Sequence, residues 1–162
     1  MTRRRSALVS VAMLGGLLLA ACSDGADLTA NQKLSISDFR AGADAVCAQV
    51  NQAVVDVRAL YTSEFTGRTP TIDEARDFLV RNVLPLVDKE VGDLHNLGEP
   101  TLNRSEWDDI MREIDSRLSA FKTAADTDPL KTLQGFNRPT TAKDSLQRQF
   151  EAFGATECAK NA

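Results

Sequence analysis

Histidine is almost absent from this chain of 162 residues, which has His95 alone and only three cysteines. A protein metal site needs several converging ligands, and the sequence shows no group of histidines, cysteines and acids with ligand spacing. Serine–histidine catalysis could use only His95, and there is no Gly-x-Ser-x-Gly elbow. A glycine-rich phosphate loop is missing too. The sequence therefore predicts no metal site, no cofactor and no catalytic residue, and it does not predict an enzyme.

Long apolar runs are also missing, except near the N-terminus. Residues 7–19 are mostly leucine, alanine, valine and glycine, and three arginines at 3–5 precede them. This run is shorter than the about 20 apolar residues that a membrane span needs. An export signal typically consists of a positively charged region, a short apolar region and small residues before the cleavage site. We expect residues 1–21 to be a signal peptide.

The apolar run ends in "LAAC", residues 19–22, which resembles the lipobox of bacterial lipoproteins. The resemblance implies that Cys22 is acylated on its sulfur and becomes the first mature residue. The predicted location is the extracytoplasmic face of the cell membrane, with the lipid as anchor. Residues 22–36 are polar and aperiodic and are predicted to be a flexible tether. "TRRRSAL" leaves the choice between the general and the twin-arginine export routes open.

Three further stretches resemble small lipoproteins of actinobacteria: "DAVCAQV", "LHNLGEPTLNRSEW" and "FEAFGATEC". Two cysteines that bracket a helical body are common to this loose pattern, which implies no activity. If Cys22 carries lipid, Cys47 and Cys158 remain as an even pair in an oxidising compartment. We therefore predict a disulfide bond between them.

The mature chain has an excess of acidic side chains. Without the arginines of the signal it has 16 basic and 23 acidic residues, a net charge near −7. This balance argues against nucleic acid as a partner and against a protein surface that lies on anionic lipid. Membrane attachment is therefore assigned to the lipid alone, and the oligomeric state stays open.

Strand signals are absent, and apolar residues recur at helical spacing through the rest of the chain. Helices are predicted over about 37–61, 71–97, 105–125 and 141–153, with a short helical turn at 128–135. Three long helices, a turn and a shorter last helix predict an all-α, antiparallel four-helix bundle over 37–158, followed by a tail at 159–162. This topology places the last helix beside the start of the first, where Cys47 and Cys158 can meet.

Several residues predict where the helices begin, end or bend. Pro85 should kink the second helix, and Gly135 should stop the short turn. The predicted N-caps are Ser37, Thr71 with Glu74 as a capping box, Ser105 with Asp108, and Asp128. Acid-to-base pairs at i,i+4 are expected to support the helices rather than to catalyse; they are Asp77–Arg81, Asp108–Arg112, Glu113–Arg117 and Asp144–Arg148.

Two functions remain open at this level, of which the sequence favours the first. The first is an interaction or accessory module of the cell envelope, with a protein partner at the end far from the anchor. The hypothetical contact surface there consists of Phe65, Arg68, Lys131, Phe136 and Arg138. The second is a binding protein for a small apolar ligand of the envelope, such as a lipid or haem. A cavity around Trp107 and Pro85 would favour the second function, whereas a dry, filled core there would argue against it.

Overall fold

A computed structural model describes residues 34–138 and 143–161. The predicted lipidation residue Cys22, the signal peptide and most of the tether lie outside the described residues. The described body is all-α, as predicted. Its helices are α1 (Ile36–Glu64), α2 (Ile72–Phe78), α3 (Leu84–Asn96), α4 (Arg104–Thr127), α5 (Pro129–Phe136), α6 (Ser145–Phe153) and α7 (Cys158–Asn161), with a π-helix, η1 (Leu79–Val83), between α2 and α3.

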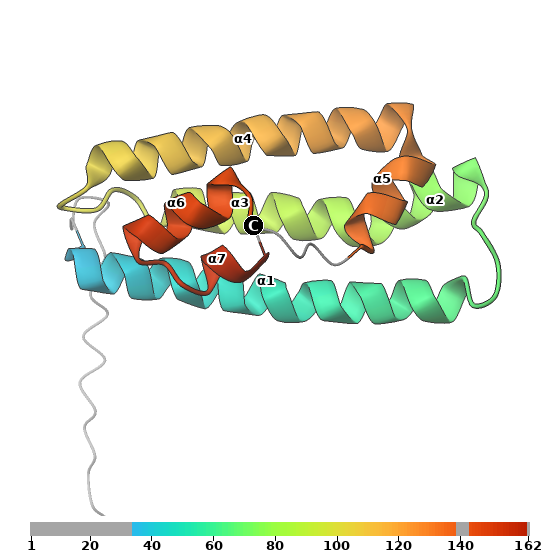
Figure 1. Ribbon diagram of the computed structural model, residues 1–162, viewed down its shortest axis with the longest axis horizontal. Coiled ribbons are helices and arrows are strands. Elements are labelled where there is room, and N and C mark those ends of the chain that lie inside the picture. Colours follow the sequence, from blue (N-terminus) through green and yellow to red (C-terminus); the bar gives the residue numbers. More distant parts are fainter. Residues whose placement is uncertain (1–33, 139–142, 162) are drawn as a thin grey trace, which may run out of the picture. The chain divides into compact units, whose positions relative to one another are not determined.

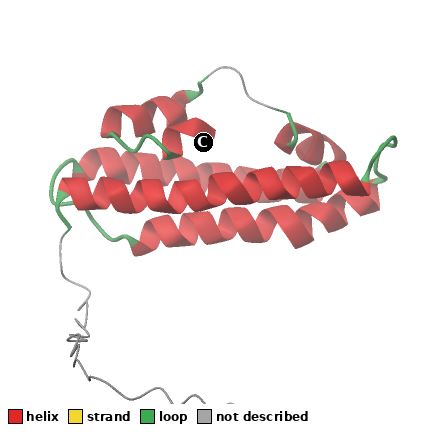
Figure 2. Ribbon diagram, turned by 90° about the horizontal axis from the view of Figure 1, so that it is seen from below, coloured by secondary structure: helices red, strands yellow, loops and turns green. Residues whose placement is uncertain are grey.

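Three long helical segments form the bundle: α1, the continuous α2–η1–α3 segment, and α4 (Figure 1). They run antiparallel, each packing against the next. The fourth position of the bundle is shared by α5 and by the pair α6–α7. Helix α5 packs on α2 and α4 at one end, whereas α6 packs on α4 and α7 on α1 at the other (Figures 1 and 2). The fourth helix of the predicted bundle is therefore interrupted.

The folded body begins earlier than predicted, because residues of the expected tether are part of it. The backbone N–H of Thr101 donates to the carbonyl of Leu34 at 3.3 Å, which joins the chain before α1 to the α3–α4 loop. Ser35, not Ser37, caps α1: its hydroxyl accepts the Asp38 N–H at 3.2 Å. The predicted tail also belongs to the body, since α7 continues to Asn161.

The second helical segment begins as predicted, with both hydrogen bonds of the Thr71–Glu74 capping box present. The irregularity expected from Pro85 appears as the π-helix η1, in which the Leu84 N–H donates to the carbonyl of Leu79. Proline has no N–H for the carbonyl four residues earlier, and a π turn just before it changes the hydrogen-bond register there.

Three of the other predicted helix boundaries are wrong. Helix α4 begins at Arg104 after Asn103, whose left-handed backbone (φ 59°) asparagine tolerates better than most residues; Ser105 therefore lies inside the helix. Asp128 caps α5 as predicted, accepting the Lys131 N–H at 3.3 Å, but Gly135 is inside α5 and the helix ends at Phe136. Helix α6, the last helix that the sequence predicted, begins later than expected, at Ser145, where Asp144 and Gln147 form a capping box.

The core consists of two separate clusters of buried side chains. The first surrounds Phe39, Trp107 and Phe153 at the end where α1 and α4 begin. The second surrounds Phe78, Leu79 and Leu133 at the opposite end, under α5. We call these the proximal and the distal cluster. The two clusters are separate because the fourth helix of the bundle is interrupted: α6 and α7 cover only the proximal cluster, and α5 covers only the distal one.

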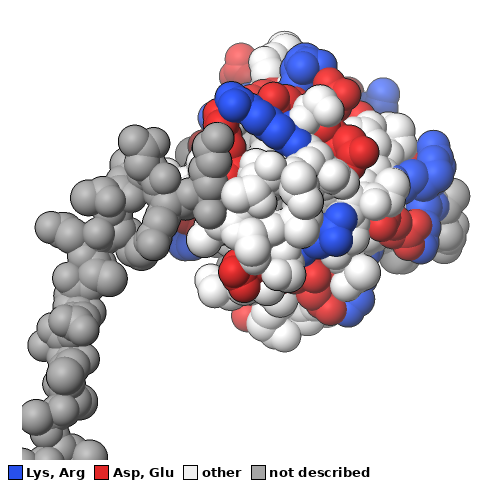
Figure 3. Space-filling view, turned by 90° about the vertical axis from the view of Figure 1, so that its left-hand side faces the viewer, with Lys and Arg blue, Asp and Glu red and all other residues white. Residues whose placement is uncertain are grey.

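Figure 3 shows the end of the bundle where α1 and α4 begin. On this face the described acidic and basic side chains are interspersed, and neither sign forms an extended field. Several of them pair across short distances, such as Arg104 with Glu99 at 2.5 Å. This end thus resembles an ordinary solvated surface.

Candidate functional site

The two cysteines predicted to pair form a disulfide bond, with Cα atoms 5.0 Å apart and a sequence separation of 111. The bond joins α1 to α7. Polar contacts support the same junction: the Glu157 N–H donates to the Asp44 carboxylate at 2.7 Å, and the Asn51 side chain donates to the Glu157 carbonyl. The C-terminal segment is therefore fixed against the first helix.

The hypothetical contact surface does not form one exposed patch. Phe65 is only 4% exposed and belongs to the distal cluster, where its ring lies 5.7 Å from that of Phe78. Arg68 covers the Phe65 ring and pairs with Glu74 at 2.8 Å. The sequence misassigned Phe65 because it lies in a connection, and connections are usually on the surface.

The remaining three residues of that hypothetical surface lie on or just after α5. Lys131 and Arg138 are exposed, while Phe136 is half-buried against the distal cluster. The Phe136 ring lies under the guanidinium of Arg58, 5.4 Å from its centroid. Phe136 and Arg138 thus belong to a different part of the molecule, a groove in the middle of the bundle.

His95 forms no part of a cluster. It is exposed, and its Nε2 lies 2.9 Å from a carboxylate oxygen of Asp115. Among the described residues no three histidine, cysteine, aspartate or glutamate side chains converge on a point that could hold a metal ion. One predicted i,i+4 ion pair, Glu113–Arg117, forms. Arg112 pairs with Asp109 instead, Arg81 donates to the backbone carbonyl of Asp77 rather than to its carboxylate, and Arg148 donates to the carbonyl of Lys143.

A groove of about 520 Å³ lies between the two core clusters and is lined by described residues of the three long helices and of the α5, α6 and α7 regions. Its volume is typical of pockets that hold small ligands, roughly 300–1,000 Å³. Helices α1, α3 and α4 supply most of the lining, and α5, α6 and α7 close its two ends. Most of the lining is apolar and includes Val54, Val87, Val91, Leu118, Phe121 and Leu146. We call it the central groove.

The central groove exists because no single helix fills the fourth position of the bundle. An uninterrupted helix there would place side chains between the proximal and the distal cluster. Instead α5 ends at Phe136 and α6 begins at Ser145, so that apolar residues of the three long helices remain partly exposed. Exposed apolar surface in a recess is characteristic of ligand-binding sites.

One carboxyl group, that of Glu90, lies in this apolar lining. Glu90 is on α3 between Val87 and Val91, and all three line the central groove. No described residue forms a hydrogen bond or an ion pair with its side chain. Burial alone raises the pKa of Glu90 from its usual 4.5 to about 7. The charged form therefore lacks the compensation that a buried carboxylate needs.

Glu90→Gln should stabilise the protein at pH 8 by on the order of 1–3 kcal/mol, because the folded wild type must hold a partly desolvated, unpaired carboxylate at that pH, and each unit of pKa shift corresponds to about 1.4 kcal/mol. The folded chain binds this proton more tightly than the unfolded chain, so wild-type stability falls as the pH rises from 4.5 through about 7. Below pH 4.5 Glu90 is mostly protonated in both the folded and the unfolded chain, so the variant should be as stable as the wild type. Urea unfolding at pH 4 and pH 8 measures both differences.

The matched control is Glu64→Gln, since Glu64 is an exposed residue at the end of α1. Its variant should unfold like the wild type at both pH values. Equal stabilisation by the two substitutions, or none at pH 8 for Glu90→Gln, would contradict the assignment of a half-buried carboxyl group without a partner.

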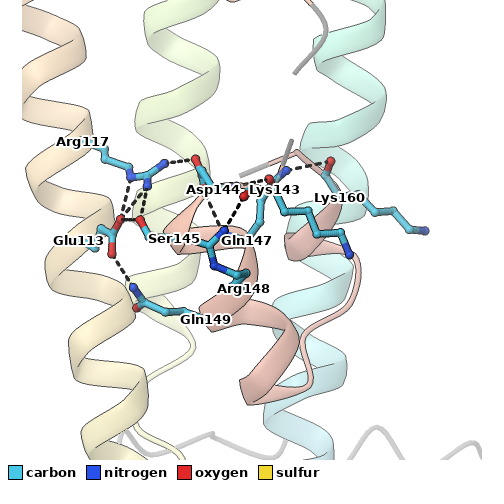
Figure 4. A network of polar contacts seen from close by, with 9 residues as sticks. All are labelled: Glu113, Arg117, Lys143, Asp144, Ser145, Gln147, Arg148, Gln149 and Lys160. Atoms are coloured by element: carbon cyan, nitrogen blue, oxygen red, sulfur yellow. Dashed lines mark hydrogen bonds and ion pairs between the residues drawn. The ribbon is translucent and has the colours of Figure 1, made fainter. Parts of the chain in front are cut away.

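A polar network fixes α6 against α4 beside the groove (Figure 4). Arg117 is at its centre, donating to Glu113 at 2.6 Å and to Asp144 at 2.5 Å. Ser145 and Gln149 both donate to Glu113, at 2.7 and 2.6 Å. Arg117 also lines the central groove, but two carboxylates already neutralise its charge.

Hydrogen bonds hold the acids of this network in their charged form. Hydrogen bonds from Ser145 and then from Arg117 lower the pKa of Glu113. For Asp144, burial acts in the opposite direction, but hydrogen bonds from Arg117 and from the Gln147 backbone outweigh it and lower the pKa. The network is thus a structural support, with donors and acceptors matched.

A second, more open hollow of about 740 Å³ lies between α4 and α6 on the outside of the bundle. Its rim consists of exposed charged side chains such as Glu106, Asp109 and Arg112. Arg112 and Asp109 pair with each other at 2.7 Å. This hollow is therefore a less suitable site for an apolar ligand than the central groove.

The cavity around Trp107 and Pro85 that would have favoured a ligand-binding protein is not found among the described residues, and the central groove lies elsewhere. Trp107 is 3% exposed and packs in the proximal cluster, while Pro85 is exposed. Neither residue lines the groove. The described lining also contains no histidine, methionine or tyrosine, and its one cysteine, Cys158, is in the disulfide. It thus has no side chain that could ligate a haem iron.

Within the described part of the chain, no helix combines the length and the hydropathy that crossing a membrane requires. Comparison with protein-family models, with curated proteins and with solved structures finds no match to this chain.

Proposed function

We propose that the mature protein is a lipid-anchored binding protein on the extracytoplasmic face of the cell membrane, and that it holds a small, mainly apolar ligand in the central groove. The observation that carries this proposal is the groove itself: about 520 Å³ of mostly apolar lining between two filled clusters. The lining has one titrating carboxyl, Glu90, and no pair of nucleophile and base, which favours binding over catalysis.

The other function considered from the sequence, an accessory module with a protein partner at its distal end, has less support. Phe65 is buried, and Arg68 is occupied by Glu74. Lys131 and Arg138 remain exposed, but they flank the half-buried Phe136 rather than a larger apolar patch.

Filling the groove tests the proposal. Val54 lines the central groove, and the next residue, Val55, is 57% exposed on the outside of α1. In the full chain carrying Cys22→Ser, Val54→Trp should weaken binding of the neutral fluorophore N-phenylnaphthylamine at least about tenfold, because the indole occupies part of the site. The matched control, Val55→Trp, should bind like the parent. Equal binding by both variants, or no binding by the parent, would contradict the proposal.

The anchor is tested separately. Cys22→Ser should abolish incorporation of radioactive palmitate and move the protein from the membrane pellet to the soluble extracytoplasmic fraction, because the lipid supplies the attachment. The control is the Cys47→Ser, Cys158→Ser double variant, which should keep its label. Label that persists in Cys22→Ser would show that the anchor has been misassigned.

A further inference from the structure

The central groove is cationic at one end and apolar along its length. We propose that its ligand is a single-chain amphiphile with an anionic head group, of the fatty-acid class, with the head at Arg58 and Arg138 and the tail along the groove toward α6 and α7. This inference rests on the proposed function and names the ligand class of the same site.

Arg58 is held in place but has no anionic partner. Its Nε donates to the carbonyl of Phe136 at 3.1 Å, and its guanidinium lies 5.4 Å from the centroid of the Phe136 ring. These contacts fix the planar group at the edge of the groove and leave its two terminal nitrogens available. No described carboxylate forms an ion pair with it, although five other arginines of this acidic protein have one. A fixed guanidinium with free donors is suited to a carboxylate or phosphate.

Arg138 brings a second positive charge to the same end. It lies two residues after Phe136, in a turn closed by a hydrogen bond from its N–H to the Gly135 carbonyl at 3.1 Å. It too lines the groove and has no ion pair with a described carboxylate. Two arginines that line the groove without a described counter-charge make this end complementary to an anionic head group.

The orientation of the ligand follows from Arg117, the third arginine in the groove lining. Arg117 lines the groove on the side of α6, where Glu113 and Asp144 neutralise it at 2.6 and 2.5 Å. The lining beyond it is apolar and includes Leu146, Phe150 and Cys158. An anionic head therefore has its counter-charges only at the Arg58 end, and the tail extends toward α6 and α7.

Glu90 lies in the lining between these ends. As a neutral acid it tolerates an acyl tail; as a carboxylate it would lose its remaining water to the tail and repel the anionic head. The charged groups that line the groove with it are Arg58, Arg117 and Arg138. The pKa of Glu90, raised to about 7 by burial, supports a bound state with the proton in place.

The ligand class is tested by isothermal titration calorimetry with three probes of equal chain length: dodecanoate, dodecanol and dodecyltrimethylammonium. The full chain carrying Cys22→Ser should bind dodecanoate at least about tenfold more tightly than the other two, since charge-assisted hydrogen bonds form only with the anionic head. In the Arg58→Gln, Arg138→Gln variant this preference should disappear while dodecanol affinity stays unchanged, which also shows that the groove is intact. The control Arg81→Gln, on the exposed side of η1, should behave like the parent.

The role of Glu90 is tested with dodecyl sulfonate, whose own charge is constant. Its affinity should fall about tenfold between pH 6 and pH 8 in the parent, because only the protonated fraction binds, and the fall should be absent in Glu90→Gln. Dodecanol binding as tightly as dodecanoate, or an unchanged preference in the double arginine variant, would overturn the inference while leaving the proposed function intact. Failure of all three probes to bind would overturn both.

Discussion

Replacing both Cys47 and Cys158 by alanine should lower the free energy of unfolding by about 4–5 kcal/mol. The two residues are 111 positions apart, so the bond closes a loop of nearly the whole folded body and restricts the unfolded chain strongly. The effect should also be local. Helix α7 has four residues, and Cys158 is both its first residue and part of the groove lining.

Urea unfolding with and without reductant measures this effect. Reductant should destabilise the wild type by a similar amount and leave the double alanine variant unchanged. A wild-type protein that unfolds at the same urea concentration in both conditions would contradict the assigned role of the bond. We also expect the double variant to lose affinity for the groove probe, because the end of the groove that α6 and α7 close is no longer tied to α1.

The second large effect is expected for Phe39→Ala, at about 3–5 kcal/mol. Phe39 is fully buried, and its ring meets those of Trp107 at 4.8 Å and Phe153 at 6.1 Å, both nearly perpendicular. It therefore connects α1 to α4 and to α6 in the centre of the proximal cluster. Truncation removes buried area and leaves a cavity that three separate helices would have to close.

Urea unfolding at pH 7 measures the loss, with Leu102→Ala as control, since Leu102 is 61% exposed in the α3–α4 loop. The control should change stability by less than about 0.5 kcal/mol. A loss below 1 kcal/mol for Phe39→Ala would show that the proximal cluster is not packed as described.

The helices were predictable because their signals are local. The capping box of Thr71 and Glu74 and the cap at Asp128 depend on residues three positions apart, and both are present. The disulfide was predictable for a different reason, since the antiparallel topology brings the two ends of the body together. Where competing local signals exist, as with Ser35 and Ser37 before α1, the sequence favoured the wrong one.

The central groove was not predictable in the same way, because it depends on how two short helices divide one position of the bundle. Glu90 carried the signal that could have indicated it: a carboxyl between Val87 and Val91 on the inward side of a helix. Phe65 was misassigned because its burial also depends on tertiary structure. Its connection folds back over the distal cluster, and nothing in the local sequence shows this.

The most direct test of the central claim is to locate a bound ligand by nuclear magnetic resonance in the full chain carrying Cys22→Ser. With dodecanoate, the account predicts intermolecular NOEs from the chain methylenes to the methyl groups of Val54 and Leu118, which line the groove. It predicts none to the exposed Val55. NOEs confined to Ile110 and Ala152, in the outer hollow between α4 and α6, would contradict the account.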